Sequence, residues 1–138
     1  MPDVAKYISD AIDMLKGMIS IPSVSRDEQA VADYFCHQLE GMGIGYRRHG
    51  NNIWCVTDHF DVQKPTILLN AHLDTVKPVP AWTKDPFTPE EVNGRIYGLG
   101  SNDCGGGVVC LLQVFRILSK EEENYNLVYL ASCEEDFR

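Results

Sequence analysis

The sequence lacks several features that would place the chain in a specialised class. None of its apolar runs approaches the roughly 18 residues that a membrane-spanning helix requires. The first residues have neither the basic segment nor the apolar segment of a secretory signal peptide. Internal repeats and low-complexity tracts are absent too. A length of 138 residues therefore predicts one ordinary globular domain.

Positive charge is also scarce, with 12 Lys and Arg against 20 Asp and Glu, which gives a net charge of −8. Nucleic acids and anionic membranes would repel such a chain at long range, so neither is an expected partner. The five cysteines contain no CxxC pair, and their number is odd. We expect reduced thiols in a cytoplasmic protein.

Two amphipathic helices are predicted in the first third of the chain. Apolar residues recur at helical spacing over residues 4–19. A second helix is expected to end near Gly41 or Gly43, with Ser25 as its N-cap and Glu28 three positions later in a capping box.

Apolar strands alternate with the predicted helices in the rest of the chain. The almost continuously apolar run at 66–71 predicts a central strand that is buried on both faces. The other elements expected from the pattern are strands at 46–49, 53–57 and 127–132, a short strand or turn at 94–98, and a buried helix at 104–118. This alternation predicts the α/β class, with helices covering a mainly parallel sheet.

Polar residues follow the predicted strand at 66–71. His72 and Asp74 are two residues apart, so on an extended backbone both side chains project to the same side. A histidine that binds a metal ion commonly has a carboxylate or carbonyl on its other ring nitrogen, and Asp74 is a candidate for that partner. A polar loop with a surface histidine is the commoner situation for such a pair alone.

A glycine-rich segment at 98–107 contains Asp103 just before the predicted buried helix. The positive end of the helix dipole would stabilise this carboxylate there, as it does at an ordinary Asp N-cap. The glycines fit neither GxGxxG nor GxxxxGK[ST], which argues against a phosphate loop. Cys104 is better explained as a structural thiol than as a nucleophile, because the sequence offers it no base.

The third polar cluster, Glu134, Glu135 and Asp136, follows the predicted strand at 127–132. Adjacent residues at a strand end point in opposite directions, so one glutamate could bind a metal ion while the other acts as a base. Such a cluster alone is usually surface charge. Together, however, the three clusters predict a metal site outside the carboxyl ends of an α/β sheet. Their imidazole and carboxylate groups suit zinc.

These motifs resemble the co-catalytic zinc aminoacylase and carboxypeptidase family, which includes acetylornithine deacetylase and succinyl-diaminopimelate desuccinylase. The resemblance extends over essentially the whole chain, in the order of the family, through residues 21–25, 70–76, 82–87, 94–103 and 132–135. It implies a three-layer α/β/α fold of the zinc-peptidase type. It also implies that residues 1–138 are the N-terminal part of the catalytic domain, with a dimerisation domain and a second catalytic part beyond them.

The resemblance implies a role for each polar residue. His72 matches a ligand of the first of two zinc ions, and Asp74 matches the carboxylate that supports it. Asp103 matches the carboxylate that bridges both ions, and Glu135 a ligand of the second. Glu134 matches the general base that takes a proton from the attacking water. Zinc is the expected cofactor, and cobalt is a possible replacement.

The same resemblance implies a metal-dependent amidohydrolase that removes an acyl group from an N-acyl amino acid. An acetylornithine deacetylase-like enzyme is the first expectation, and a dipeptidase or desuccinylase is the alternative within the family. A non-catalytic fragment or interaction module is the alternative from another class. The full-length protein would be a homodimer. Residues 1–138 alone should be inactive, because they supply only two ligands for each metal ion.

Three local features of the chain are also expected. By resemblance, the peptide between Asp103 and Cys104 should be cis. Many relatives have Met-Lys-Gly after the bridging aspartate where this chain has Cys104-Gly105-Gly106, so this loop leaves the substrate open. The strand at 127–132 is expected to lie at an unpaired edge, where apolar strands recruit partners.

Overall fold

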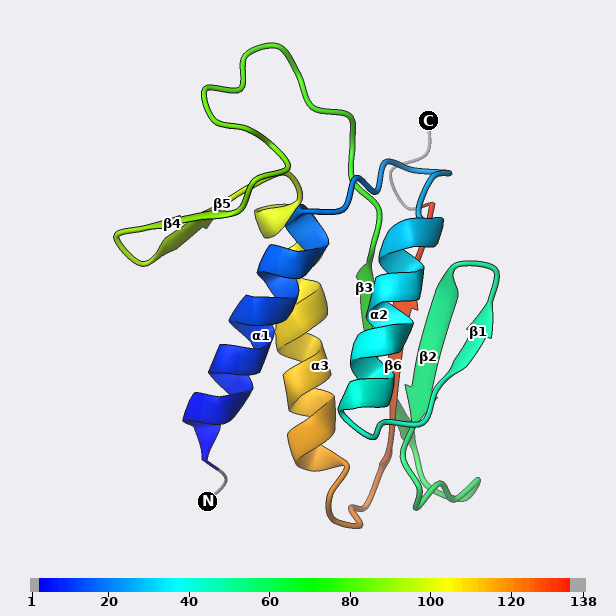
Figure 1. Cartoon of the computed structure of the whole chain (residues 1–138). Coiled ribbons are helices and arrows are strands. Elements are labelled where there is room, and N and C mark those ends of the chain that lie inside the picture. Colours follow the sequence, from blue (N-terminus) through cyan, green and yellow to red (C-terminus); the bar gives the residue numbers. More distant parts are fainter. Residues whose placement is uncertain (1–2, 135–138) are drawn as a thin grey trace.

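A computed structural model describes residues 3–134 as a sheet covered by helices (Figure 1). This arrangement confirms the predicted α/β class. The described helices are not long and apolar enough for any of them to cross a membrane. In chain order the elements are α1 (Val4–Ile19), α2 (Gln29–Gly41), β1 (Arg47–His49), β2 (Asn52–Val56), β3 (Thr66–His72), β4 (Glu90–Val92), β5 (Arg95–Tyr97), the turn η1 (Ser101–Gly105), α3 (Gly106–Leu118) and β6 (Asn126–Ser132).

The main sheet has the strand order β1-β2-β6-β3 and is mixed. β6 is parallel to β3 but antiparallel to β2, and β1 is antiparallel to β2. The prediction of a mainly parallel sheet therefore does not describe these four strands. For β1 and β2 the physical reason is the turn at residues 50 and 51, where Gly50 has φ of 60°. A turn this short can join only antiparallel strands, because a parallel connection needs a crossover.

The positions of β3 and β6 are the reverse of those predicted. β6 lies between β2 and β3 and pairs with both, so it is not an unpaired edge. β3 lies at the edge of the sheet as described, and its Ile67 and Leu68 are 45% and 55% exposed. A run of apolar residues indicates an environment that can bury them, but it does not specify the order of strands in the sheet.

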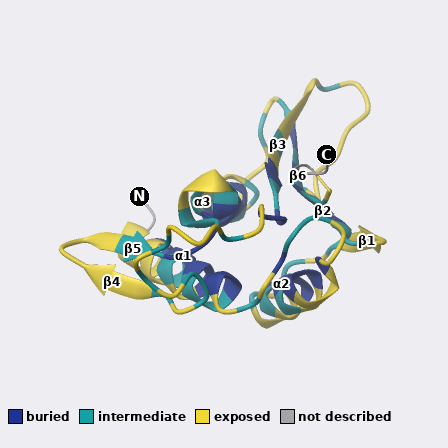
Figure 2. Cartoon of the chain, turned by 90° about the horizontal axis from the view of Figure 1, so that it is seen from above, coloured by how far each residue is buried: buried dark blue, intermediate teal, exposed yellow. Residues whose placement is uncertain are grey.

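All three helices lie on the same side of the sheet (Figure 2), with α2 and α3 against its strands and α1 packed on α2 and α3. The described residues therefore form two of the three layers that the resemblance implied. Alternate residues of a strand point to opposite faces, so Leu69 and Tyr129 face the helices while their neighbours Leu68 and Val128 face the other way. Within residues 3–134 no helix lies against this outer face (Figures 1 and 2).

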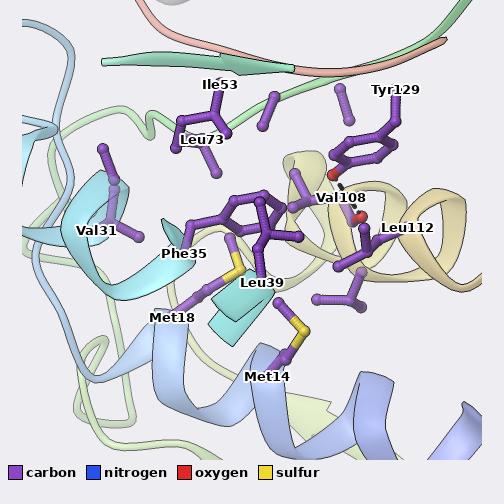
Figure 3. Packing of buried hydrophobic residues seen from close by; sticks show 14 of the residues in the cluster. Met14, Met18, Val31, Phe35, Leu39, Ile53, Leu73, Val108, Leu112 and Tyr129 are labelled. Atoms are coloured by element: carbon purple, nitrogen blue, oxygen red, sulfur yellow. Dashed lines mark hydrogen bonds between the residues drawn. The ribbon is translucent and has the colours of Figure 1, made fainter. Parts of the chain in front are cut away.

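The hydrophobic core lies between the helices and the inner face of the sheet (Figure 3). Tyr129 of β6 is fully buried, and its ring stacks on Phe35 of α2 with centroids 6.0 Å apart. Its hydroxyl donates a hydrogen bond of 2.8 Å to the carbonyl oxygen of Val108 in the first turn of α3. These contacts fix the N-terminal end of α3 against β6, which is the end where the polar clusters meet.

Candidate metal centre

Two of the predicted clusters are brought together because β3 and β6 are parallel. His72, the last residue of β3, is paired with Ser132, the last residue of β6. Glu134 follows Ser132 by two residues. His72 and the exposed Glu134 therefore both lie at the carboxyl edge, by which we mean the end of the sheet where β3 and β6 terminate.

Asp103 reaches the same place from the turn that precedes α3. Its Oδ1 lies 3.0 Å from Nε2 of His72, although the two residues are 31 positions apart in the chain. Zinc binds imidazole nitrogen and carboxylate oxygen at about 2.0–2.2 Å, so two ligand atoms on one ion lie about 3–4 Å apart. The separation of Nε2 and Oδ1 is thus close to that of two atoms that share a metal ion.

The other ring nitrogen of His72 is held by Asp74, but chiefly through the backbone. Nδ1 lies 2.8 Å from the carbonyl oxygen of Asp74 and 3.5 Å from its carboxylate Oδ1. A carbonyl at this distance favours a proton on Nδ1, which leaves the lone pair of Nε2 for a ligand. Asp74 thus lies beside Nδ1, where the prediction placed it, but the nearer atom is its main-chain oxygen and not its carboxylate.

The carboxylate of Asp74 is fully buried, with 0% of the residue exposed. Its Oδ2 accepts a hydrogen bond of 2.5 Å from the Ser25 hydroxyl. The predicted capping box is therefore wrong, because Ser25 bonds Asp74 and makes no contact that caps the helix. α2 begins at Gln29, with Glu28 at the N-cap position and no side-chain capping bond. Ser25 and Glu28 do both form side-chain hydrogen bonds, but their partners are Asp74 and the Glu134 amide and not the first turn of α2.

Two glycines allow the segment that carries Asp103 to turn sharply. Gly100 has φ of 77°, and a Cβ there would lie 2.5 Å from Cγ2 of Thr75. The amide of Gly105 donates a hydrogen bond of 2.7 Å to the carbonyl oxygen of Gly100, which closes the turn. The peptide between Asp103 and Cys104 is cis, as the sequence analysis expected.

Cys104 contacts the backbone of His72. Its Sγ lies 3.2 Å from both the amide nitrogen and the carbonyl oxygen of His72, accepting from the first and donating to the second. The ligand atoms of His72, Asp103 and Cys104 all lie within 4.8 Å of one another. Sequence reasoning placed Cys104 as a structural thiol and did not connect it with His72, since the contact spans 32 residues.

The backbone that leads out of β6 is held by side chains from two other elements. The amide of Cys133 donates to Oδ1 of Asn52 at 3.0 Å, and the amide of Glu134 donates to Oε1 of Glu28 at 2.9 Å. Burial, together with the negative charges of Glu28 and Glu134, raises the pKa of the Cys133 thiol. Sequence reasoning missed both anchors, because neither Asn52 nor Glu28 is near residue 134 in the chain.

Glu135 and Asp136, which belong to the third cluster, lie outside the described residues. The structure therefore brings His72 and Asp103 together, and the predicted convergence with Glu135 stays a prediction.

The donor set at the carboxyl edge fits a divalent metal ion. An imidazole nitrogen, a carboxylate oxygen and a thiol sulfur gather there, and the buried carboxylate of Asp74 adds negative charge beside them. Imidazole, carboxylate and thiolate are the ligands that zinc takes in proteins. The fold and the site thus place the chain in the class of α/β proteins that have a metal-binding site at the carboxyl ends of parallel strands.

Residues 68–137 match the family model described as Peptidase family M20/M25/M40, and the chain belongs to this family. It is 32% identical over 111 residues to a succinyl-diaminopimelate desuccinylase of Xylella fastidiosa strain M23, a match that covers 76% of this chain and 29% of the relative. A protein of the same name from Coxiella burnetii strain Dugway 5J108-111 is 27% identical over 125 residues, covering 86% of this chain and 33% of the relative. The chain spans about a third of the length of these relatives.

Solved structures support the same fold. The dipeptidase Dug1p of Saccharomyces cerevisiae superposes with a TM-score of 0.74 at 22% identity, over 97% of this chain and 34% of Dug1p. The M20 family metallo-carboxypeptidase Sso-CP2 of Sulfolobus solfataricus superposes with a TM-score of 0.68 at 22% identity, over 91% of this chain and 31% of its own. The YXEP protein of Bacillus subtilis, described as a dinuclear metal binding peptidase from the M20 family, has a TM-score of 0.66 at 15% identity, covering 92% of this chain and 35% of that protein.

Proposed function

We propose that this chain is the N-terminal part of the catalytic domain of a metal-dependent amidohydrolase that removes the acyl group from an N-acyl amino acid. The observation that carries the proposal is the 3.0 Å approach of His72 Nε2 to Asp103 Oδ1 at the carboxyl edge. Membership of the M20/M25/M40 family supports it, and so does the one-third coverage of the relatives. The dimerisation domain and the rest of the catalytic domain would follow residue 138.

Two zinc ions are the proposed cofactor, with cobalt as a possible substitute. His72 would hold the first ion, Glu135 the second, and Asp103 both. Asp74 keeps the proton of the His72 ring on Nδ1 and so leaves Nε2 available as a ligand. When bound, the ions would polarise the scissile carbonyl and lower the pKa of the attacking water.

Glu134 is the proposed general base, and it is exposed at the carboxyl edge. Its carboxylate would accept the proton of the water that attacks the acyl carbonyl and pass it to the departing amine. Glu135 follows Glu134 directly in the chain, and the proposal gives the two glutamates different roles, base and metal ligand.

A more specific part of the proposal is the identity of the acyl group that is removed. A succinyl group is supported by the desuccinylase name of the relatives that are 27–32% identical. An acetyl group, as in acetylornithine deacetylases, was the expectation from the sequence motifs. The substrate is thus a small N-acyl amino acid or dipeptide, and the proposed assembly is a cytoplasmic homodimer.

The test is an assay of the full-length protein on N-succinyl and N-acetyl amino acids and on dipeptides, before and after removal of metal by a chelator and again after zinc is restored. We expect metal-dependent release of one acyl group, with succinyl or acetyl substrates preferred to dipeptides. Faster hydrolysis of dipeptides would shift the proposal to a dipeptidase. Equal turnover with and without metal would overturn it.

A further inference from the structure

Glu28 is a buried carboxylate for which the proposed reaction has no use. Only 1% of the residue is exposed, and it lies at the N-cap position of α2. The dipole at the N-terminus of a helix stabilises a negative charge, which offsets part of the cost of burying this carboxylate. Its Oε1 accepts a hydrogen bond of 2.9 Å from the backbone amide of Glu134, 106 residues later in the chain.

The backbone of Glu134 has an unusual conformation. Its φ is 58°, in the left-handed region that residues other than glycine seldom adopt. Surrounding contacts have to hold a residue in that region, since the backbone alone does not favour it. The hydrogen bond from the Glu134 amide to Oε1 of Glu28 is a contact of that kind, and the bond from the Cys133 amide to Asn52 holds the residue before it.

The conformation of a residue decides where its side chain projects. If the Glu134 amide turned away from Glu28, the Cα–Cβ bond of Glu134 would rotate as well. The Glu134 carboxylate would then leave its exposed position at the carboxyl edge, where the proposed reaction needs it. Ser25, three residues before Glu28, holds Asp74 by its hydroxyl. The short segment that leads into α2 therefore contacts both the support of His72 and the backbone of the proposed base.

We propose that Glu28 is a positioning residue for Glu134. It fixes the backbone of the general base through one hydrogen bond and does not touch the substrate itself. This inference rests on the proposed function, because it takes Glu134 as the base.

The test compares Glu28→Ala, Glu28→Asp and Glu28→Gln in the full-length protein. Glu28→Ala removes the acceptor, and Glu28→Asp keeps the charge but draws the acceptor back by one methylene group. We expect kcat to fall about 10- to 100-fold in both, with KM and metal content changed less than about twofold, because a misplaced group of this kind costs up to about 10² in rate. Glu28→Gln retains a carbonyl oxygen that can accept the same hydrogen bond, so its kcat should stay near that of the parent.

A second readout does not depend on activity. Hydrogen exchange at the amide of residue 134 should be faster in Glu28→Ala and Glu28→Asp than in the parent, and nearly unchanged in Glu28→Gln. Val31→Ala is the matched control, because Val31 is fully buried on the same helix and its truncation destabilises the protein without touching this bond. That variant should keep both kcat and the exchange rate at residue 134.

Unchanged exchange at residue 134 in both Glu28→Ala and Glu28→Asp would overturn the proposal, as would an equal fall of kcat in Val31→Ala at a similar loss of stability. Glu134→Gln separates this failure from failure of the proposed function. If Glu134→Gln keeps full activity, Glu134 is not the base and the proposed mechanism falls, whatever the exchange shows. If Glu134→Gln is inactive and Glu28→Ala and Glu28→Asp are fully active, only the positioning role falls.

Discussion

At the scale of single residues, the site is built from side chains that are held by the main chain of other segments. Nδ1 of His72 lies against the carbonyl oxygen of Asp74, and the backbone of His72 itself lies against the sulfur of Cys104. Such contacts restrict the ring and the loop before any ligand binds. Restriction of this kind lowers the entropy that a ligand has to remove.

Replacing Glu134 by glutamine tests its role as a base. The amide is nearly the same size but cannot accept a proton, so kcat of the full-length protein should fall by about 10²- to 10⁴-fold. Metal content, measured by elemental analysis, should remain close to that of the parent. Glu121→Gln, an exposed glutamate outside the site, is the control and should change neither quantity. Loss of zinc with undiminished activity per metal ion would instead make Glu134 the ligand and Glu135 the base.

Replacing Asp103 by alanine should have the opposite signature. Asp103 approaches His72 Nε2 directly, so its loss removes a proposed ligand of both ions. We expect metal affinity to drop by more than the roughly 10- to 100-fold typical of an outer-sphere partner, with activity lost in parallel. Titration with zinc, read by calorimetry, measures the affinity, and Asp58→Ala at another exposed aspartate is the control. Full metal binding by the Asp103 variant would remove it from the site.

At the scale of elements, α1 and α3 are joined by a charged contact as well as by the core. Arg116 of α3 donates a hydrogen bond of 2.8 Å to Oδ2 of Asp10 on α1, and its guanidinium lies 5.0 Å from the ring centroid of Tyr7. The hydrogen bond from Arg116, aided by Lys6, lowers the pKa of Asp10. Three quarters of the Asp10 side chain is shielded from solvent, so this contact is screened less than an ordinary surface pair.

This shift predicts how Asp10→Asn depends on pH. A carboxyl group whose pKa is lower in the folded state stabilises the fold above its unfolded pKa of about 3.9, and that stabilisation disappears as the pH falls through the folded value. We expect Asp10→Asn to reduce the free energy of unfolding by about 0.5–1 kcal/mol at neutral pH. The difference from the parent should shrink below about pH 4.

Urea unfolding of parent and variant at a series of pH values measures this difference. Asp13→Asn, at an exposed position of the same helix, should show a smaller effect at neutral pH. A destabilisation of Asp10→Asn that stayed constant down to about pH 2.5 would mean that the lost interaction is packing rather than charge.

At the scale of the whole molecule, the outer face of the sheet is apolar. Leu68 and Val56 are exposed there, next to the half-buried Val128 between them in the sheet. The edge of β3 beside them is unpaired within the described residues, except where Cys104 contacts His72. An apolar face next to an open strand edge favours association with another chain.

Residues 1–138 produced alone should therefore self-associate, through β3 rather than through β6 as the sequence suggested. Leu68→Lys places a charge on the outer face and should shift sedimentation toward the monomer, because burying an unpaired ammonium group is costly. Val62→Lys is the control, since Val62 is 87% exposed in the loop before β3 and should leave association unchanged. A parent chain that remains monomeric at high concentration would contradict this expectation.

Features that depend on local pattern could be predicted from the amino-acid sequence. The helical period over residues 4–19 and the apolar runs at 66–71 and 127–132 predicted α1, β3 and β6 close to their observed bounds. The same pattern identified His72, Asp74 and Asp103 as candidate site residues, because each is a polar residue that follows an apolar strand or precedes a helix in the sequence.

The hydrogen-bond partner of each polar group, by contrast, follows from the folded arrangement of the chain. Ser25 and Glu28 have the spacing of a capping box, yet Ser25 bonds Asp74 and Glu28 bonds the amide of Glu134. The order of the strands also depends on contacts between distant segments, because β6 pairs with both β2 and β3 and therefore lies between them. Local spacing fixes which hydrogen bonds a residue can make with its neighbours in the chain. Whether a polar side chain bonds a neighbour in the chain or a distant residue depends on which groups the fold buries beside it. Those groups come together only when the strands pair and the core packs.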